Sequence, residues 1–405
     1  MDNKTIKKDN IIYALTLISI LTMFLPPIYL PIGTSTLIVY FGELPLYVLF
    51  LLSVVAVLKS NKIVINNLFL ILFLITFLGL ISILNAEDYG RYFIGLSTYI
   101  ETILIVFIFS NVNFNGNSIL KLQKYYLFSS VVLCMQILYE TLAVNNGNFK
   151  IGEKIVLEIG GSNYLATILM IPFFILLTFV FTKEKQVLNI ILLVIIGTSI
   201  ILTGSRTSLI VLIALTTSII MKEIFFNFKI KFRKRIKYGL LSIITIVIIY
   251  IFTGKFVRQM IEEGRFENLS SQSNAISRFQ IYNDYYDAFL SHPIIGSGLM
   301  NVDGLNQNYL AHNFILQAFG DGGFLFGVFF ILLILYMYLF LNKIIKLKTE
   351  NAHFVLGYKR GYIAVLIHGL FEPNFGTKLF MIYLFIGYGL IIAEHYNFKK
   401  MMKRD

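Results

Sequence analysis

The chain has 405 residues, of which 57% are hydrophobic and only 14% are charged, and its mean hydropathy is +0.77. Soluble domains carry about 25% charged residues, so the composition excludes a soluble enzyme and indicates an integral membrane protein. The single cysteine, Cys134, excludes an intrachain disulfide. The sequence contains no cluster of cysteine and histidine residues that would predict a metal site.

Apolar runs divide the chain into predicted membrane spans, because roughly 20 helical residues cross about 30 Å of hydrocarbon. The first run follows a basic N-terminus but lacks a cleavage site, which predicts a retained helix. The twelve predicted spans lie near 11–32, 36–58, 65–85, 93–111, 125–143, 163–182, 187–203, 206–222, 238–254, 313–342, 356–371 and 377–396. The expected fold is all-α and polytopic, with spans in 1–254, a long loop at 255–311 and further spans in 312–405.

The loops alternate in positive charge along the chain. If the N-terminus is cytoplasmic, 25 of the 34 lysine and arginine residues fall in cytoplasmic segments. This positive-inside pattern predicts that both termini are cytoplasmic and that loop 255–311 faces the outside. Basic loops contact anionic lipid headgroups, so the net charge of +12 needs no nucleic acid partner.

The outer loop contains the stretch SRFQIYNDYYDAFLSHPIIGSGL. Ser277 and Gln280 match a capping box and predict that a helix starts here, and Pro293 ends it. Arg278 would then lie in the first helical turn, beside N–H groups, where an anion can bind. One face is aromatic, which predicts an amphipathic helix on the outer surface; this face comprises Phe279, Tyr282, Tyr286 and Phe289.

A second polar stretch, LTGSRTSLI, lies between two apolar runs. The outer turn is so short that Arg206 is expected at or below the headgroup level. A charged residue at that depth usually faces a cavity or a partner. The alternative is that the side chain reaches out to the interface.

A third stretch begins with His312 and Asn313 and is interrupted by glycine at 320–323. A broken helix at membrane depth is tolerated where it lines a cavity, so His312 is predicted at a cavity mouth. The alternative is a polar cap on an incoming helix. Other polar residues in or beside spans are expected to form interhelical hydrogen bonds: Glu43, Glu101, Glu140, Asn163, His368 and Glu372.

Two arginines and a histidine on one face suggest a particular chemistry. Guanidinium groups bind a diphosphate bidentately, and a histidine can take a proton from a hydroxyl. No nucleotide-binding or metal motif is present in the sequence. The residues therefore predict attack by a sugar hydroxyl on a lipid-diphosphate-linked sugar, with no cofactor.

Three motifs resemble the O-antigen ligase and polymerase family of bacterial envelope glycosyltransferases: TGSRTSLI, SRFQIYNDYYDAFLSHPIIGSGL and AHNFILQAFGDGGFLFG. GGSNYLATI is similar to a family Asn-x-x-Ala segment. The resemblance covers the arrangement of most of the chain. It departs at Phe326, which stands where the family has a last glycine.

The resemblance implies metal-independent, inverting transfer from an undecaprenyl-diphosphate-linked glycan to a glycan acceptor. Arg206 and Arg278 would hold the diphosphate, His312 would activate the acceptor and Asn313 would orient it. It also implies substrate contacts by Ser205, Asn163 and Tyr282. The protein would lie in the bacterial plasma membrane with its site on the extracytoplasmic face. A flippase and a chain-length regulator would be its protein partners.

The motifs leave open which acceptor is used. A polymerase joins lipid-linked repeat units, whereas a ligase transfers polymer to lipid A–core. The abundance of Ile, Asn and Lys is common in Gram-positive bacteria, which lack lipid A, and favours a capsule or surface-polysaccharide polymerase. A polysaccharide flippase or other secondary transporter is the remaining alternative, although no repeated halves are evident.

Overall fold

A computed structural model describes residues 3–32, 35–112, 114–144, 155–182, 186–223, 272–302, 310–347, 349 and 351–402. The chain forms two compact units, one comprising 1–129, 277–352 and 372–405 and the other 130–276 and 353–371. In the described residues each unit is helical apart from one short antiparallel hairpin. The all-α polytopic membrane fold predicted from the sequence is confirmed.

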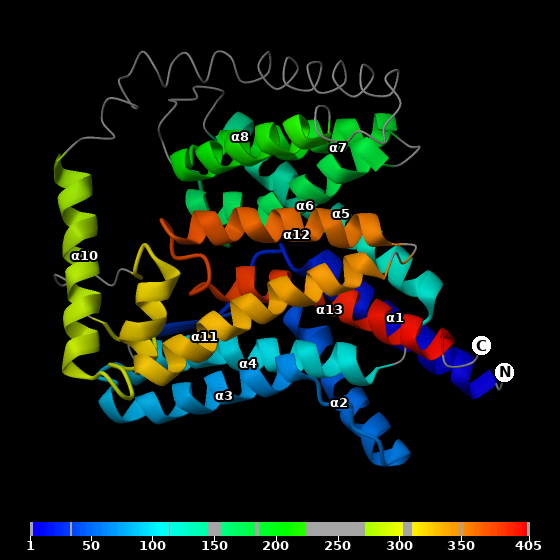
Figure 1. The fold of residues 1–405 in the computed structure, drawn as a ribbon, viewed down its shortest axis with the longest axis horizontal. Coiled ribbons are helices and arrows are strands. Elements are labelled where there is room, and N and C mark those ends of the chain that lie inside the picture. The colour runs from blue at the N-terminus through cyan, green and yellow to red at the C-terminus, as the bar shows by residue number, and fades with distance from the viewer. Residues whose placement is uncertain are drawn as a thin grey trace. The chain divides into compact units, whose positions relative to one another are not determined.

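The first unit is built around α13, which is almost wholly buried. In Figure 1, α13 packs on α4, α4 on α3, and α3 on α11. Its elements are α1 (Asn3–Thr22), β1 (Ile28–Ile32), β2 (Ser35–Val39), α2 (Glu43–Ser60), α3 (Asn67–Ile81), η1 (Ser82–Asn85), α4 (Tyr89–Asn111), most of α10 (Gln272–Ser291), α11 (Phe314–Lys346) and α13 (Lys378–Met401).

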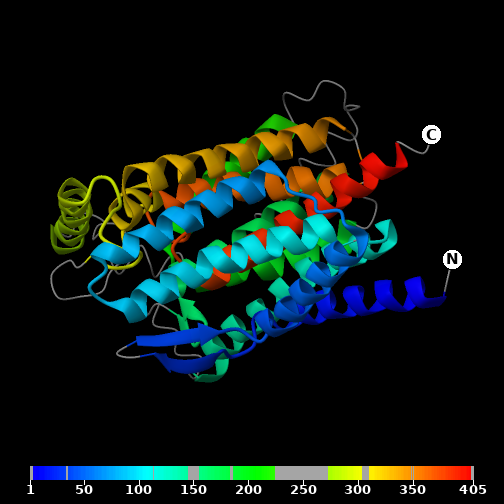
Figure 2. The same cartoon turned by 90° about the horizontal axis from the view of Figure 1, so that it is seen from below.

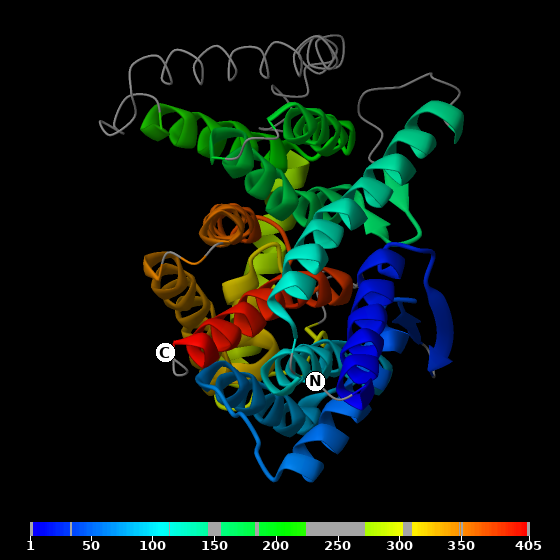
Figure 3. The same ribbon diagram turned by 90° about the vertical axis from the view of Figure 1, so that its right-hand side faces the viewer.

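The second unit has α6 as its buried centre, with α7 and α8 packed against it (Figure 3). α5 (Gly116–Tyr139) begins in the first unit and ends in the second. The other elements are η2 (Glu140–Val144), β3 (Val156–Leu157), β4 (Gly160–Gly161), α6 (Ser162–Thr182), α7 (Gln186–Leu202), α8 (Arg206–Met221) and α12 (Ala352–Gly369).

Among the described residues, 7 helices are long and apolar enough to cross a membrane, and three shorter ones are also apolar. These helices coincide with every predicted span except two. The predicted span 238–254 lies outside the described residues. The other, 356–371, corresponds to α12, which carries Lys359 and Arg360 and is not apolar enough to count as a candidate span.

The first two predicted spans are only partly helical. α1 ends at Thr22, before Pro26 and Pro27, and β1 then pairs with β2 in an antiparallel hairpin, drawn in dark blue in Figure 2. Proline ends a helix, and the β-branched residues that follow suit a strand. Apolar content alone does not separate a short strand from a helix, so the predicted boundaries there were wrong.

Three charged residues inside the first unit, Lys378, Glu43 and Glu101, are paired with one another. The Lys378 ammonium donates to Glu43 Oε2 at 2.9 Å and contacts Glu101 Oε1 at 2.8 Å. The same ammonium donates to the Ile38 carbonyl in β2, which ties the hairpin to α4 and α13. Charges in a low-dielectric interior persist only when paired. The interhelical bonds predicted for Glu43 and Glu101 are confirmed.

α11 is broken at Gly323, whose φ of 77° is left-handed. A loop that follows α10 supplies the hydrogen bonds that the break releases. Ser297 N–H donates to the Gly320 carbonyl, Gly298 N–H to the Asp321 carbonyl, and Phe324 N–H to the Pro293 carbonyl. The predicted interruption at 320–323 is therefore confirmed and lies at its last glycine.

Replacing Gly323 by alanine tests this break. A Cβ there would lie 2.5 Å from the Ile294 carbonyl oxygen, in a backbone conformation that favours glycine. Gly323→Ala is expected to destabilise the protein by more than about 2 kcal/mol. Gly116→Ala is the matched control, because a Cβ at Gly116 meets nothing within 4 Å. Thermal unfolding in detergent measures both, and equal midpoints would contradict the expectation.

Candidate active site

α10 carries two of the predicted site residues, Arg278 and Tyr282, and runs crosswise to α11 (Figures 1 and 2). It buries Ile281 and Tyr285 against Val302 and Ala311. Of its predicted aromatic face, two members are mostly exposed and two are half-buried; the exposed ones are Phe279 and Tyr286. This arrangement agrees with a helix on the surface of its unit.

The predicted start of this helix is wrong. α10 begins at Gln272, so Ser277 lies inside the helix and does not cap it. Arg278 therefore lies beyond the first turn, and the free N–H groups of the helix terminus do not explain its position. Local capping signals recur within helices, and the residues before Ser277 are also compatible with a helix.

Glu372 lies between α12 and α13 and joins two of the predicted residues. Its Oε1 accepts a hydrogen bond from Arg278 Nη2 at 3.0 Å. Its Oε2 lies 3.1 Å from Nδ1 of His312. The carboxylate is 3% exposed, whereas the Arg278 and His312 side chains are 39% and 24% exposed. A buried negative charge thus holds two partners that both reach the surface.

This contact assigns the hydrogen on the His312 ring. An ionised carboxylate accepts hydrogen bonds but cannot donate them, and Arg278 beside it stabilises the ionised form. Nδ1 must then carry the hydrogen, which leaves Nε2 of the neutral ring as an acceptor. Arg278 has five N–H donors, and only one is used by Glu372 among the described residues.

The backbone of His312 is held by α10. The Tyr282 hydroxyl donates to the His312 carbonyl at 3.1 Å. The pKa of Tyr282 is raised, mainly by burial and also by Glu372, against an opposing effect of Arg278. The hydroxyl therefore stays protonated and available as a donor at neutral pH.

Asn313 caps α11. Its Oδ1 accepts hydrogen bonds from Ile315 N–H at 2.9 Å and Leu316 N–H at 3.2 Å. An asparagine is among the best residues for this role. The cap accounts for the asparagine beside His312, and substrate contact by Asn313 stays a prediction.

The remaining predicted residues belong to the second unit. Ser205 caps α8, with its Oγ accepting from Ser208 N–H, and Arg206 is the first residue of that helix. Ser208 Oγ lies 2.9 Å from His368 Nε2. Asn163 is the second residue of α6 and is half-buried. Substrate contact by Ser205, Arg206 and Asn163 stays a prediction.

His368 joins three helices of the second unit. Besides Ser208 on α8, it contacts Thr167 on α6, with 3.0 Å between Nδ1 and the hydroxyl oxygen. Both ring nitrogens are therefore occupied by hydroxyl groups inside the unit. The interhelical hydrogen bonding predicted for His368 is confirmed.

For Glu372 the sequence predicts only an interhelical hydrogen bond, and its contacts with Arg278 and His312 are not evident from the sequence. The residue stands 60 positions from His312 and 94 from Arg278, so no local spacing connects them. The available signal was a carboxylate on the outer side of the predicted topology, the same side as the two residues it contacts. In the part of the chain that the structure describes, no group of three or more His, Cys, Asp or Glu could hold a metal ion.

Phe326, where the sequence departs from the family pattern, fills a buried space behind the break. Its ring meets Tyr99 edge-on, with centroids 5.4 Å apart. A Cβ at Gly322 would lie 2.2 Å from Phe326 Cγ, so the phenylalanine occupies the room that this glycine leaves. Phe326 thus packs against Gly322 and Tyr99 beside the break.

A model of the O-antigen ligase family matches residues 191–332. In this segment the chain is similar to the O-antigen ligase family. The match spans Arg206, Arg278 and His312 and ends inside α11. This similarity supports an O-antigen ligase or polymerase type of function in general. No curated protein matches the sequence.

Tyr282→Phe tests how the His312 backbone is held. The variant removes one hydrogen bond and is expected to cost about 1 kcal/mol. Amide hydrogen exchange at 312–316 should become faster. Tyr286→Phe is the matched control, since Tyr286 lies one turn away on α10 and is mostly exposed. Equal exchange in both variants would show that Tyr282 does not hold this segment.

Proposed function

We propose that this protein, whose residues 191–332 match the O-antigen ligase family, is an extracytoplasmic glycosyltransferase. It polymerises undecaprenyl-diphosphate-linked oligosaccharide repeat units of a capsule, O-antigen or other surface polysaccharide. The observation that carries the proposal is the single buried carboxylate of Glu372, which contacts both His312 and Arg278. It supports the proposal because a histidine and a guanidinium group lie beside the same carboxylate.

The transfer step needs a base that takes the proton from the acceptor hydroxyl. The acceptor hydroxyl oxygen forms a bond to the anomeric carbon of the donor sugar while the bond from that carbon to the diphosphate oxygen breaks. The hydroxyl proton passes to His312 Nε2, and the diphosphate leaves with the bonding electron pair. Glu372 stabilises the imidazolium that forms, as a carboxylate does behind a catalytic histidine. Attack opposite the leaving group inverts the anomeric configuration.

The leaving group needs positive charge. The N–H donors of Arg278 that Glu372 does not use can bind diphosphate oxygens, and guanidinium binds phosphate bidentately. Arg206 is the predicted second arginine for the same diphosphate. Negative charge grows on the leaving oxygens as the bond breaks, so these contacts strengthen in the transition state. Such a site needs no metal ion.

The acceptor decides between polymerisation and ligation. The composition favours a polymerase, as in Gram-positive bacteria without lipid A. Purified protein in vesicles with lipid-linked repeat units as both donor and acceptor should yield a ladder of longer lipid-linked products without any ion gradient. Transfer only when lipid A–core is added would support the ligase. Export of unchanged substrate would support a transporter.

His312→Ala is expected to reduce this polymerisation about a thousandfold or more, because it removes the base. His292→Ala is the matched control, since His292 is an exposed histidine that follows α10. Product ladders from equal amounts of each purified variant measure the effect, with size-exclusion profiles as the check on folding. Wild-type ladder length in His312→Ala would refute the role.

Glu372→Gln is expected to lower turnover about a hundredfold, because the amide keeps the shape but loses the charge behind His312. Glu372→Asp keeps the charge and should recover part of the activity. Glu394→Gln is the control, since Glu394 is another buried glutamate, paired with Gln123 Nε2 at 3.0 Å. Similar turnover in Glu372→Gln and Glu394→Gln would show that Glu372 does not position the base.

A further inference from the structure

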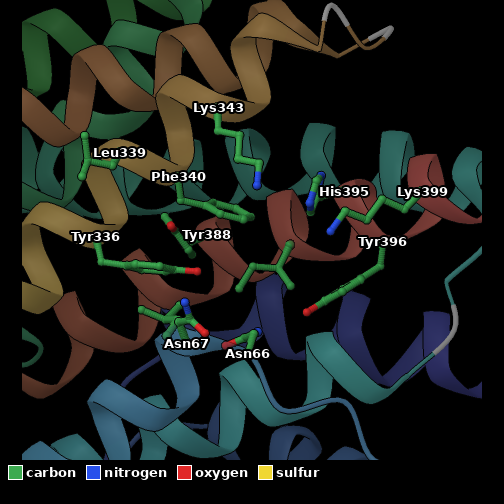
Figure 4. Close-up of a pocket in the computed structure, with 12 residues that line it drawn as sticks. Asn66, Asn67, Tyr336, Leu339, Phe340, Lys343, Tyr388, His395, Tyr396 and Lys399 are labelled. Carbon is green, nitrogen blue, oxygen red and sulfur yellow. The ribbon is translucent and has the colours of Figure 1, made fainter.

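A cavity of about 380 Å³ lies in the first unit, between the start of α3 and the last turns of α11 and α13. Figure 4 shows the side chains that line it. The walls are largely aromatic, from Tyr336, Phe340, Tyr388 and Tyr396. About 29 helical residues separate His312 from Lys343 at the cavity, or roughly 40 Å along α11. The cavity is therefore separate from the candidate active site.

Positive charge converges on this cavity. Lys343 from α11 and Lys399 from α13 both line it, and Figure 4 shows their ammonium groups turned toward the space beside His395. No acidic side chain is among the described residues that line it. The positive-inside pattern predicts this end of both helices at the cytoplasmic leaflet, where anionic lipids are concentrated.

His395, on α13, is a buried side chain that lines the cavity. The residue is 4% exposed, and its Nδ1 has no hydrogen-bond partner within the described part of the chain. The ring is fixed edge-on against Phe340, with centroids 5.4 Å apart. Leaving a buried nitrogen unsatisfied costs stability, and the ring that carries this nitrogen lines the cavity.

The N-terminus of α3 adds to the positive potential. Asn66 caps this 15-residue helix by accepting from Phe69 N–H, and Asn67 and Leu68 open it beside the cavity. First-turn N–H groups lack partners within a helix and carry the positive end of its dipole. Helix N-termini bind phosphate for this reason.

An apolar path continues from the cavity along α11. Leu339 lines the cavity, and Leu335 and Leu332 follow it on the same helical face. All three are exposed, at 54%, 49% and 43%. Cationic and hydrogen-bonding groups thus lie beside a surface suited to an acyl chain.

We propose that this cavity binds the phosphate-bearing head of an anionic membrane phospholipid. Lys343 and Lys399 bind the phosphate, and the polar rim formed by His395 and the α3 N-terminus hydrogen-bonds the head. The acyl chains lie along the exposed leucines of α11. The same phosphate chemistry could come from a soluble ligand, and the experiment below separates the two sources.

The full-length protein is reconstituted in nanodiscs of equal parts phosphatidylcholine and phosphatidylglycerol, and native mass spectrometry identifies the lipids retained on release. Wild-type protein is expected to retain phosphatidylglycerol in preference to phosphatidylcholine. Lys343→Gln combined with Lys399→Gln should weaken this retention about tenfold or more. Lys343→Arg combined with Lys399→Arg keeps both charges and should preserve it.

Lys346→Gln combined with Lys400→Gln is the matched control. It removes the same charge from the ends of the same helices but from residues that do not line the cavity, and it should retain the lipid. Equal retention of both lipids by the wild type, or equal loss in both glutamine pairs, would overturn the proposal. If inorganic phosphate displaces the bound lipid, and only the variant with Lys343→Gln and Lys399→Gln loses this displacement, the site binds a soluble phosphate. That result would overturn the lipid proposal. Binding is read without glycan transfer, so the result is independent of the proposed function.

Discussion

The backbone break at Gly323 is the constraint on which the geometry of the first unit depends. A broken helix at membrane depth exposes N–H and C=O groups that lipid cannot satisfy, and the loop after Pro293 supplies their partners. The Pro-x-x-Gly-x-Gly stretch and the Gly-x-x-Gly stretch are thus two halves of one structural element. Because this loop leaves α10 directly, satisfying the break also positions α10 against the start of α11, and so brings Tyr282 to the backbone of His312.

Glu372 completes that arrangement from a third segment. One buried carboxylate contacts a cation on α10 and a histidine before α11, so the three segments share one negative charge. Burial strengthens these contacts because water does not screen them. The contact with Glu372 also fixes the orientation of the His312 ring. Nδ1 faces Glu372, and Nε2 is left to act as an acceptor. This geometry is what a base that removes a proton from a sugar hydroxyl requires.

Different cationic side chains lie beside the two ends of α11. Beside its N-terminal end lie Arg278 and His312, for which we propose a diphosphate that leaves during the reaction. At its C-terminal end, two lysines and a buried histidine surround a cavity with no acidic lining among the described residues. Guanidinium binds in a fixed bidentate geometry, whereas lysine acts as a mobile point charge. The two kinds of cation therefore agree with the two proposals, a reacting diphosphate at one end and a bound headgroup at the other.

Composition and hydrophobic periodicity by themselves determined the membrane class, most of the spans and the glycine break, because these depend on local residue types. The break predicted from glycine in α11 and the helix end predicted from Pro293 are both confirmed, because glycine and proline act on their own backbone. Three features were decided only by tertiary structure: the β1–β2 hairpin, the start of α10 at Gln272 and the contacts of Glu372 with Arg278 and His312. A short apolar run can be strand or helix until its partner is known, and a capping pattern can lie inside a longer helix. A carboxylate 60 residues from its histidine becomes part of a site only when the fold brings the two together.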